Sequence, residues 1–127
     1  MSKTVLTTVN KALNDLGINY QYGRWDSEVV YPYWVGDLQE TPATSEDGQQ
    51  ESSLILQGHS REGLLPLEND KEAIEQLFHP ISGHISVADN GNVVAIFYAN
   101  SQHVKSVDAE LKRMDIYITI KEWKVNL

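Results

Sequence analysis

Residues 110–123 read Glu-Leu-Lys-Arg-Met-Asp-Ile-Tyr-Ile-Thr-Ile-Lys-Glu-Trp, and this stretch decides the class of fold. Every second residue from Ile116 to Ile120 is isoleucine, so one face of an extended strand is apolar. The opposite face carries a mixed set: Tyr117, Thr119, Lys121 and Trp123. Successive side chains of a strand point to opposite faces of a sheet. The pattern predicts a long final strand, Glu110–Trp123, with one face on a core and the other in water or in an interface.

Two amphipathic segments predict helices. In Ser2–Leu16, apolar residues recur at the three- and four-residue spacing of one helix face. In Asn69–Phe78, Asn69 is followed three residues later by Glu72, which resembles a capping box. We therefore expect one helix at the start of the chain and a second near its middle.

Further extended segments lie between and after these helices. They are predicted at Ile18–Trp25, Val29–Leu38, Glu51–Gly58, Gly83–Ala88 and Val93–Tyr98. Pro32 cannot donate to a strand ladder, so its segment should begin at a sheet edge or contain a bulge. The Asn90-Gly91 pair predicts a hairpin. The polar segments Gln39–Gln50 and Ala99–Ala109 are expected as loops, the first of them mobile and acidic.

This order predicts one α+β domain over residues 1–127, with a mostly antiparallel sheet that carries two helices on one face. The expected core combines the apolar faces of the helices and strands. It comprises Val5, Val9, Leu13, Leu16, Leu54, Leu56, Ile74, Leu77, Phe78, Ile116, Ile118 and Ile120.

Composition narrows the function. The 127 residues include no cysteine, so disulfides, thiolate metal sites and a cysteine nucleophile are excluded. A formal net charge of −8 repels phosphate backbones and favours a partner with a basic surface. The N-terminus is too polar for a signal peptide, and no apolar run approaches membrane-spanning length. We expect a protein that is soluble and cytosolic where it is made, with neither membrane association nor sequence-specific nucleic-acid binding.

The residues predict no catalytic centre, metal site or cofactor. The four histidines, His59, His79, His84 and His103, lack the short spacings with carboxylates that metal sites use. Residues 58–63 bring Ser, His and Glu together in sequence, but no G-x-S-x-G elbow surrounds them. We interpret this segment as a strand end that turns into a glycine-bounded loop, and we expect a protein that is not an enzyme.

Two features suit contact with other molecules. Consecutive aromatic residues on an alternating strand cannot all face one core, and tyrosine and tryptophan anchor many interfaces. The candidate subunit interface is Trp25, Tyr31, Tyr33, Trp34 and Trp123. Composition leaves core packing and interface equally open for these side chains. The simplest interpretation of the acidic loop is a surface exposed to solvent. The functional alternative is that the loop lines a cavity or becomes ordered on assembly.

The order of elements resembles the tail-terminator, or tail-completion, proteins of long-tailed bacteriophages. Tyr31-Pro32-Tyr33-Trp34-Val35 is similar to the strand entry of that family, and Ser53–Gly58 to the strand before its central helix. Asp108–Trp123 is similar to the closing strand, with Asp-x-Glu-Leu before alternating apolar residues. The hairpin at Asp89–Asn92 and the segment after it depart from the leanest form of the pattern, which leaves the sheet order there open.

This resemblance implies a minor tail protein of a phage or prophage virion, without enzymatic activity or cofactor. Such subunits form a hexameric ring that caps the tail tube and offers a surface to the neck, so the implied partners are copies of itself and the tail-tube and neck proteins. The chain would assemble in the host bacterial cytoplasm and remain in the virion. The implied channel lining is the acidic loop: Glu40, Glu46, Asp47 and Glu51. Neck and head-tail joining proteins share this architecture, and the sequence does not distinguish them from tail terminators.

A second class of function fits the same composition. A small acidic inhibitor or immunity protein would share the size, the charge and the lack of catalytic motifs, and would bind one basic partner protein. The oligomeric state distinguishes the two classes, because a ring indicates the virion part and a persistent monomer indicates the inhibitor. An enzyme is the third alternative and would require a histidine and a carboxylate converging in a deep pocket.

Overall fold

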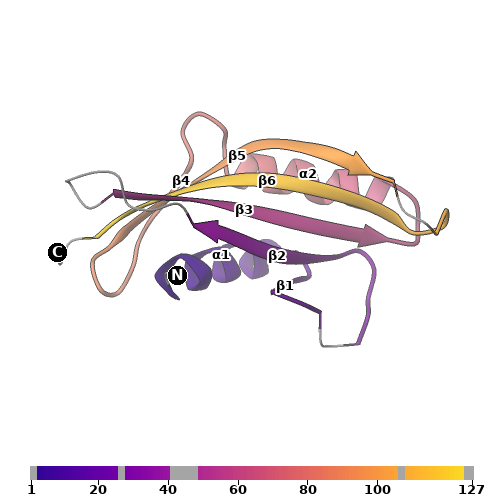
Figure 1. The fold of residues 1–127 in the computed structure, drawn as a ribbon, viewed down its shortest axis with the longest axis horizontal. Helices are drawn as coiled ribbons and strands as arrows, with labels where there is room; N and C mark the ends of the chain where they lie inside the picture. Colours follow the sequence, from indigo (N-terminus) through magenta and orange to yellow (C-terminus); the bar gives the residue numbers. More distant parts are fainter. Residues whose placement is uncertain (1–2, 26–27, 41–48, 106–107, 125–127) are drawn as a thin grey trace.

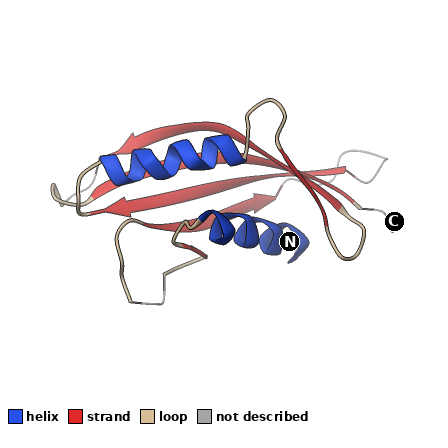
Figure 2. Ribbon diagram, turned by 180° about the vertical axis from the view of Figure 1, so that it is seen from behind, coloured by secondary structure: helices blue, strands red, loops and turns tan. Residues whose placement is uncertain are grey.

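The computed structural model describes residues 3–25, 28–40, 49–105 and 108–124. In chain order its elements are α1 (Lys3–Leu16), β1 (Tyr20–Tyr22), β2 (Tyr33–Glu40), β3 (Gln49–Ser60), α2 (Leu65–Leu77), β4 (His84–Val87), β5 (Val93–Val104) and β6 (Lys112–Trp123). These strands form a six-stranded sheet in the order β1-β2-β3-β6-β5-β4. The sheet is strongly curved, like half a barrel, and both helices lie on the same face (Figure 1, Figure 2).

The α+β class and the two helices on one face are therefore confirmed. The sheet is mixed rather than purely antiparallel, because β1 pairs with β2 in parallel, with Tyr20 opposite Trp34. The other neighbours are antiparallel. β3 and β6 form the central pair and stay in register from Gln49 and Trp123 to Ser60 and Lys112.

The alternation of the final strand sorts its side chains as predicted. Ile116, Ile118 and Ile120 are buried beneath the helices, whereas Tyr117 and Thr119 point to the opposite face and are partly exposed. We call this second face, which neither α1 nor α2 covers, the open face. The chain therefore presents one side of its sheet to its own core and leaves the other side available.

The predicted core is largely confirmed, with two exceptions. Leu16 is 38 % exposed, so its assignment to the core is wrong, and Leu77 is only half-buried against the core. The confirmed members are Val5, Val9, Leu13, Leu54, Leu56, Ile74, Phe78, Ile116, Ile118 and Ile120. Buried members that the sequence did not reveal are Ile18, Tyr20, Trp34, Leu67, Val94, Ile96 and Met114.

The second helix begins earlier than predicted. Its first residue is Leu65, so Asn69 lies inside the helix and is not its cap. Pro66 occupies the first turn, where the missing N–H of proline costs nothing and its fixed φ suits the helix. The cap position before the helix is Leu64, whose side chain makes no capping hydrogen bond. The prediction that Asn69 caps the helix is wrong because it followed the capping pattern at Asn69 and gave less weight to the proline that precedes it.

Several strand boundaries also differ from the prediction. β1 is shorter than Ile18–Trp25, since Gly23 follows it with a positive φ of 85°. β2 begins at Tyr33, so Pro32 precedes the strand and removes no ladder donor. β2 and β3 extend to Glu40 and back to Gln49, so the predicted acidic loop contributes residues to both strands. Its centre, residues 41–48, lies outside the described residues.

The predicted loop Ala99–Ala109 is wrong over its first half. β5 continues to Val104. The polar residues of this part resemble a loop in sequence, but they pair with the first half of β6 and are extended. A register shift between Tyr98 and Asn100 marks a bulge at the change from apolar to polar sequence. The β4–β5 hairpin itself is confirmed, with Gly91 at a φ of 87° donating to the Ala88 carbonyl.

The side chain of Trp34 packs on a glycine and joins β2 to the core. The ring of Trp34 lies directly over Gly58, its partner across β2 and β3. The indole nitrogen of Trp34 donates to a carboxylate oxygen of Asp70 on α2, at 2.8 Å. One buried side chain therefore links two strands and a helix.

We predict that Gly58→Ala lowers the free energy of unfolding by about 1–3 kcal/mol, the usual cost of overpacking. A Cβ at position 58 would lie 2.6 Å from the Trp34 ring, so the indole must shift. Urea denaturation followed by tryptophan fluorescence measures the change. Gln57→Ala, one residue away with its side chain on the open face, is the control and should change stability by less than about 0.5 kcal/mol. Equal effects of the two substitutions would contradict this packing argument.

Candidate subunit interface

Three of the aromatic residues selected from the sequence gather in one cluster. The ring centres of Trp25 and Tyr33 are 5.0 Å apart, and those of Tyr31 and Tyr33 are 5.6 Å apart. His59 of β3 stacks on Tyr33 at 4.9 Å, with 25° between the ring planes. We call Trp25, Tyr31, Tyr33 and His59 the aromatic cluster. Its members are partly exposed, so it combines internal packing with an accessible surface.

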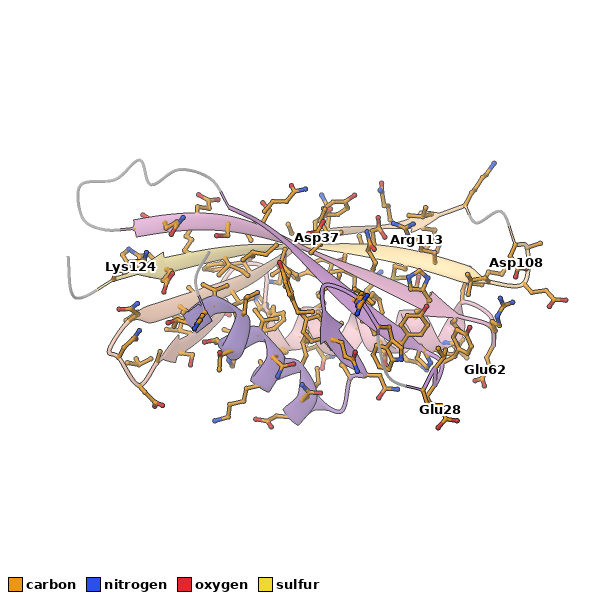
Figure 3. All side chains as sticks on the ribbon, turned by 60° about the horizontal axis from the view of Figure 1, so that its bottom comes forward. Glu28, Asp37, Glu62, Asp108, Arg113 and Lys124 are labelled. Atoms are coloured by element: carbon orange, nitrogen blue, oxygen red, sulfur yellow. The ribbon has the colours of Figure 1, made fainter. Side chains whose placement is uncertain are left out.

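Arg61 borders the aromatic cluster. Its Nε donates to the Tyr31 hydroxyl at 3.3 Å, and its guanidinium lies 6.0 Å from the centre of the Tyr31 ring. A second guanidinium nitrogen forms an ion pair with Asp108 at 2.8 Å. Figure 3 shows Asp108, Glu28 and Glu62 at the same end of the molecule. The arginine ties the turn after β3 to the segment before β6 and holds Tyr31 in place.

His59 is the unusual member of the cluster. Its Nδ1 is buried and has no hydrogen-bond partner among the described residues. Burial lowers the pKa of the imidazole below its ordinary value, and the nearby Arg113 lowers it further, whereas Asp115 acts in the opposite direction. The folded chain therefore favours a neutral His59 stacked on Tyr33.

The structure places Trp34 in the core and not at the surface. Its side chain is fully buried, so we remove it from the candidate interface. Its neighbour Asp70 is half-buried, and burial raises the pKa of that carboxyl, although the hydrogen bond from the indole acts in the opposite direction. Alternation explains the outcome, because Trp34 and Tyr33 are consecutive and only one of them can face the helices.

Trp123 lies far from the aromatic cluster. It ends β6 and is paired across the sheet with Val93 of β5, which is in turn opposite Val87 of β4. Its neighbour Lys124 lies at the opposite end of the long axis from Glu28 (Figure 3). Val87 is 68 % exposed, so Trp123 belongs to a second, apolar part of the open face.

The predicted channel-lining residues are only partly described. Glu46 and Asp47 lie outside the described residues. Glu40 is the last residue of β2, and Glu51 lies near the start of β3, exposed and opposite Lys121 in register. Antiparallel pairing of β2 with β3 thus brings the two ends of the acidic segment to one end of the sheet.

A groove that the sequence did not predict runs between α1 and the outermost strand, β4. Its cavity volume is about 740 Å³. The partly exposed Leu16 and Leu77 line it with His84 and Ser86 of β4, and Lys3 and Lys11 lie along the helix side. The two predicted core positions that fail to be buried both line this groove. Apolar residues in a helix stripe predict burial, but the sequence does not say whether the chain itself supplies the cover.

Two other histidines and Ser60 have structural partners. His103 lies 2.8 Å from Glu68, and the Nδ1 of His79 accepts the N–H of Ile81 at 3.1 Å. Ser60 is buried and accepts the N–H of Glu62. Among the described residues, no group of three or more histidine and acidic side chains is placed to hold a metal ion. Within the same residues, no helix is long and apolar enough to cross a membrane.

Comparison with known proteins gives one informative result. No protein-family model matches the sequence, and no curated protein matches it. A similar fold occurs in a solved chain described as "Virion of native gene transfer agent (GTA) particle", with a TM-score of 0.58 and 10 % sequence identity. The alignment covers 88 % of this chain and 84 % of that chain. The likeness concerns the fold and extends over nearly all of both chains, not over a shared fragment.

We predict that stability falls with acidification below about pH 6.5, and that His59→Phe reduces this dependence. The unfolded chain protonates His59 near its ordinary pKa, whereas the folded chain resists protonation, so acid favours unfolding between the two values. Urea denaturation at pH 7.5 and pH 5.5 measures the difference for both proteins. At pH 8–9 histidine is neutral in both the folded and the unfolded chain, so the difference in free energy of unfolding between the two proteins should be constant. An unchanged acid dependence in the variant would contradict the assignment.

Proposed function

We propose that this chain is a structural subunit of a phage-like particle that forms a ring closing the tail tube and joins the tail to the head. The observation that carries the proposal is the fold shared over nearly the full length with a chain of a gene transfer agent virion. The resemblance of three sequence segments to tail terminators supports the finer assignment. In this proposal the protein performs no chemistry and needs no cofactor.

The surface of the chain supports an assembling subunit. A single domain that acts alone gains little from aromatic side chains held half-exposed, whereas tyrosine and tryptophan are typical anchors of interfaces. The aromatic cluster and the patch around Trp123 lie at opposite ends of the sheet. Separate exposed surfaces suit a ring subunit, which must contact other copies of itself as well as other proteins of the particle.

The acidic segment between β2 and β3 suits the channel of such a ring. Glu40 and Glu51 mark its ends at one end of the sheet, and Glu46 and Asp47 lie between them in sequence. Repeated around a ring, these carboxylates would repel a passing DNA duplex and prevent adhesion. The formal net charge of −8 has the same effect on the whole surface.

The proposal is tested by removing the gene from cells that produce the particle. We expect separate heads and tails, with tails of irregular length, in electron micrographs, because the tube lacks its terminal ring. Expression of the intact chain from a plasmid should restore joined particles, in which peptide mass spectrometry detects it. Joined particles with tails of normal length in the absence of the gene would refute the proposal. A stable one-to-one complex with a basic protein would instead favour the inhibitor class.

We predict that Glu46→Gln combined with Asp47→Asn increases the affinity of the assembled protein for duplex DNA. Removing two carboxylates from every copy weakens the repulsion of phosphates in the channel. Fluorescence anisotropy of a labelled duplex at low salt measures the change. Glu72→Gln combined with Glu75→Gln, on the outer surface of α2, removes the same charge elsewhere and is the control. Equal effects of the two double substitutions would exclude a special role for the loop.

A further inference from the structure

The two outer sides of the sheet carry features of opposite shape. Beside β1, residues Glu28–Val30 project from the molecule, with Val29 49 % and Val30 56 % exposed. Beside β4 lies the groove lined by Leu16 and Leu77. We infer that Glu28–Val30 of one copy docks in the groove between α1 and β4 of a second copy, and that this contact repeats head to tail around the ring. The inference rests on the proposed ring and identifies the surfaces that form it.

The projecting segment is held in shape by the aromatic cluster. The Trp25 indole nitrogen donates to the carbonyl oxygen of Glu28 at 3.2 Å, while the indole ring packs on Tyr33. Farther along, the side-chain amide of Asn19 donates to the carbonyl oxygen of Pro32 at 3.2 Å. Figure 3 shows Glu28 pointing away from the body of the molecule. Two apolar side chains on an anchored segment are therefore presented without cover, and a preorganised segment loses little entropy when it binds.

The groove offers the matching apolar surface. Leu16 and Leu77 continue the buried stripes of their helices but remain partly exposed, because β4 turns polar side chains, His84 and Ser86, toward this side. A volume of about 740 Å³ accommodates two valine side chains with their backbone. Filling it would complete the burial that both helix patterns predict.

The charges beside the two surfaces favour this contact over others on an acidic chain. Lys3 and Lys11 line the groove, and among the described residues neither forms an ion pair. Glu28 is exposed and directly precedes the two valines. Asp15 and Asp89 also line the groove, which makes it neutral in a chain with a formal net charge of −8. An acidic segment meets less repulsion here than over the average surface.

The positions of the two surfaces determine the kind of assembly. β1 and β4 are the outermost strands on opposite sides of the sheet. The β1–β2 connection and the β4–β5 hairpin lie at opposite ends of α1 (Figure 1, Figure 2). A contact between different surfaces is heterologous, so each copy that docks leaves a free groove and a free projecting segment for the next. Rotation between successive copies then closes the chain of contacts into a ring.

Disulfide trapping tests this contact, since the natural chain has no cysteine. We expect the variant Val30→Cys with Thr8→Cys, one cysteine on each surface, to form a ladder of covalently linked chains when it is oxidised at high concentration. The control is Val30→Cys with Thr119→Cys, because Thr119 is also a partly exposed threonine but lies on the open face. Each single-cysteine variant should give dimers at most.

The outcomes separate this inference from the proposed function. An equal ladder in the control, or no ladder in the first variant, overturns the contact. A ring observed by native mass spectrometry without the specific ladder leaves the ring in place and shows that other surfaces form it. A specific ladder combined with normal particles after gene removal supports the contact and refutes the virion role.

A charge exchange provides a second, independent measurement. Lys11→Glu and Glu28→Lys should each reduce the fraction of assembled protein at low salt, because each places like charges together across the contact. The two substitutions combined restore opposite charges and should return assembly toward the natural level. A double variant that assembles no better than either single variant would contradict the pairing of these two sides.

Discussion

The full-length antiparallel pairing of β3 with β6 is the constraint on which the rest of the structure depends. Its register from Gln49 and Trp123 to Ser60 and Lys112 leaves neither strand free to slip, because a shift by one residue would turn the isoleucines of β6 toward solvent. The outermost strand on each side of the sheet is very short: β1 has three residues and β4 has four. The helices cover one face only. A chain built this way has a stable centre, while its two sides and its open face remain exposed.

Sequence patterns predicted the parts of the fold that depend on local chemistry. The alternating isoleucines of β6, the Asn90-Gly91 turn and the apolar stripe of α1 each reflect neighbours within a few residues. Patterns failed where a distant partner decides the structure. Ser101 and Gln102 read as a loop, yet they extend β5 because Ile116 and Asp115 lie opposite them in β6. At α2, Pro66 marked the start more reliably than the capping pattern at Asn69.

The candidate site was predictable to a smaller extent. Aromatic content identified Trp25, Tyr31 and Tyr33, which do come together, but it gave no means to separate Tyr33 from the buried Trp34. The phase of alternation in β2 depends on pairing with β3, which is not local. The contributions of His59 and Arg61 follow from the same pairing. The groove escaped prediction because Leu16 looks the same in sequence whether its cover comes from its own chain or from another.

The position of the β4–β5 hairpin has a consequence for symmetry. The side-chain amide of Asn90 donates to the Thr4 hydroxyl at 3.2 Å, and that of Asn92 donates to the Glu122 carboxylate at 3.1 Å. These two amides hold the hairpin against α1 and against β6, which fixes its position beside the groove. In the ring that we propose, the angle between successive copies sets how many complete the circle, so the placement of this hairpin would contribute to the width of the opening.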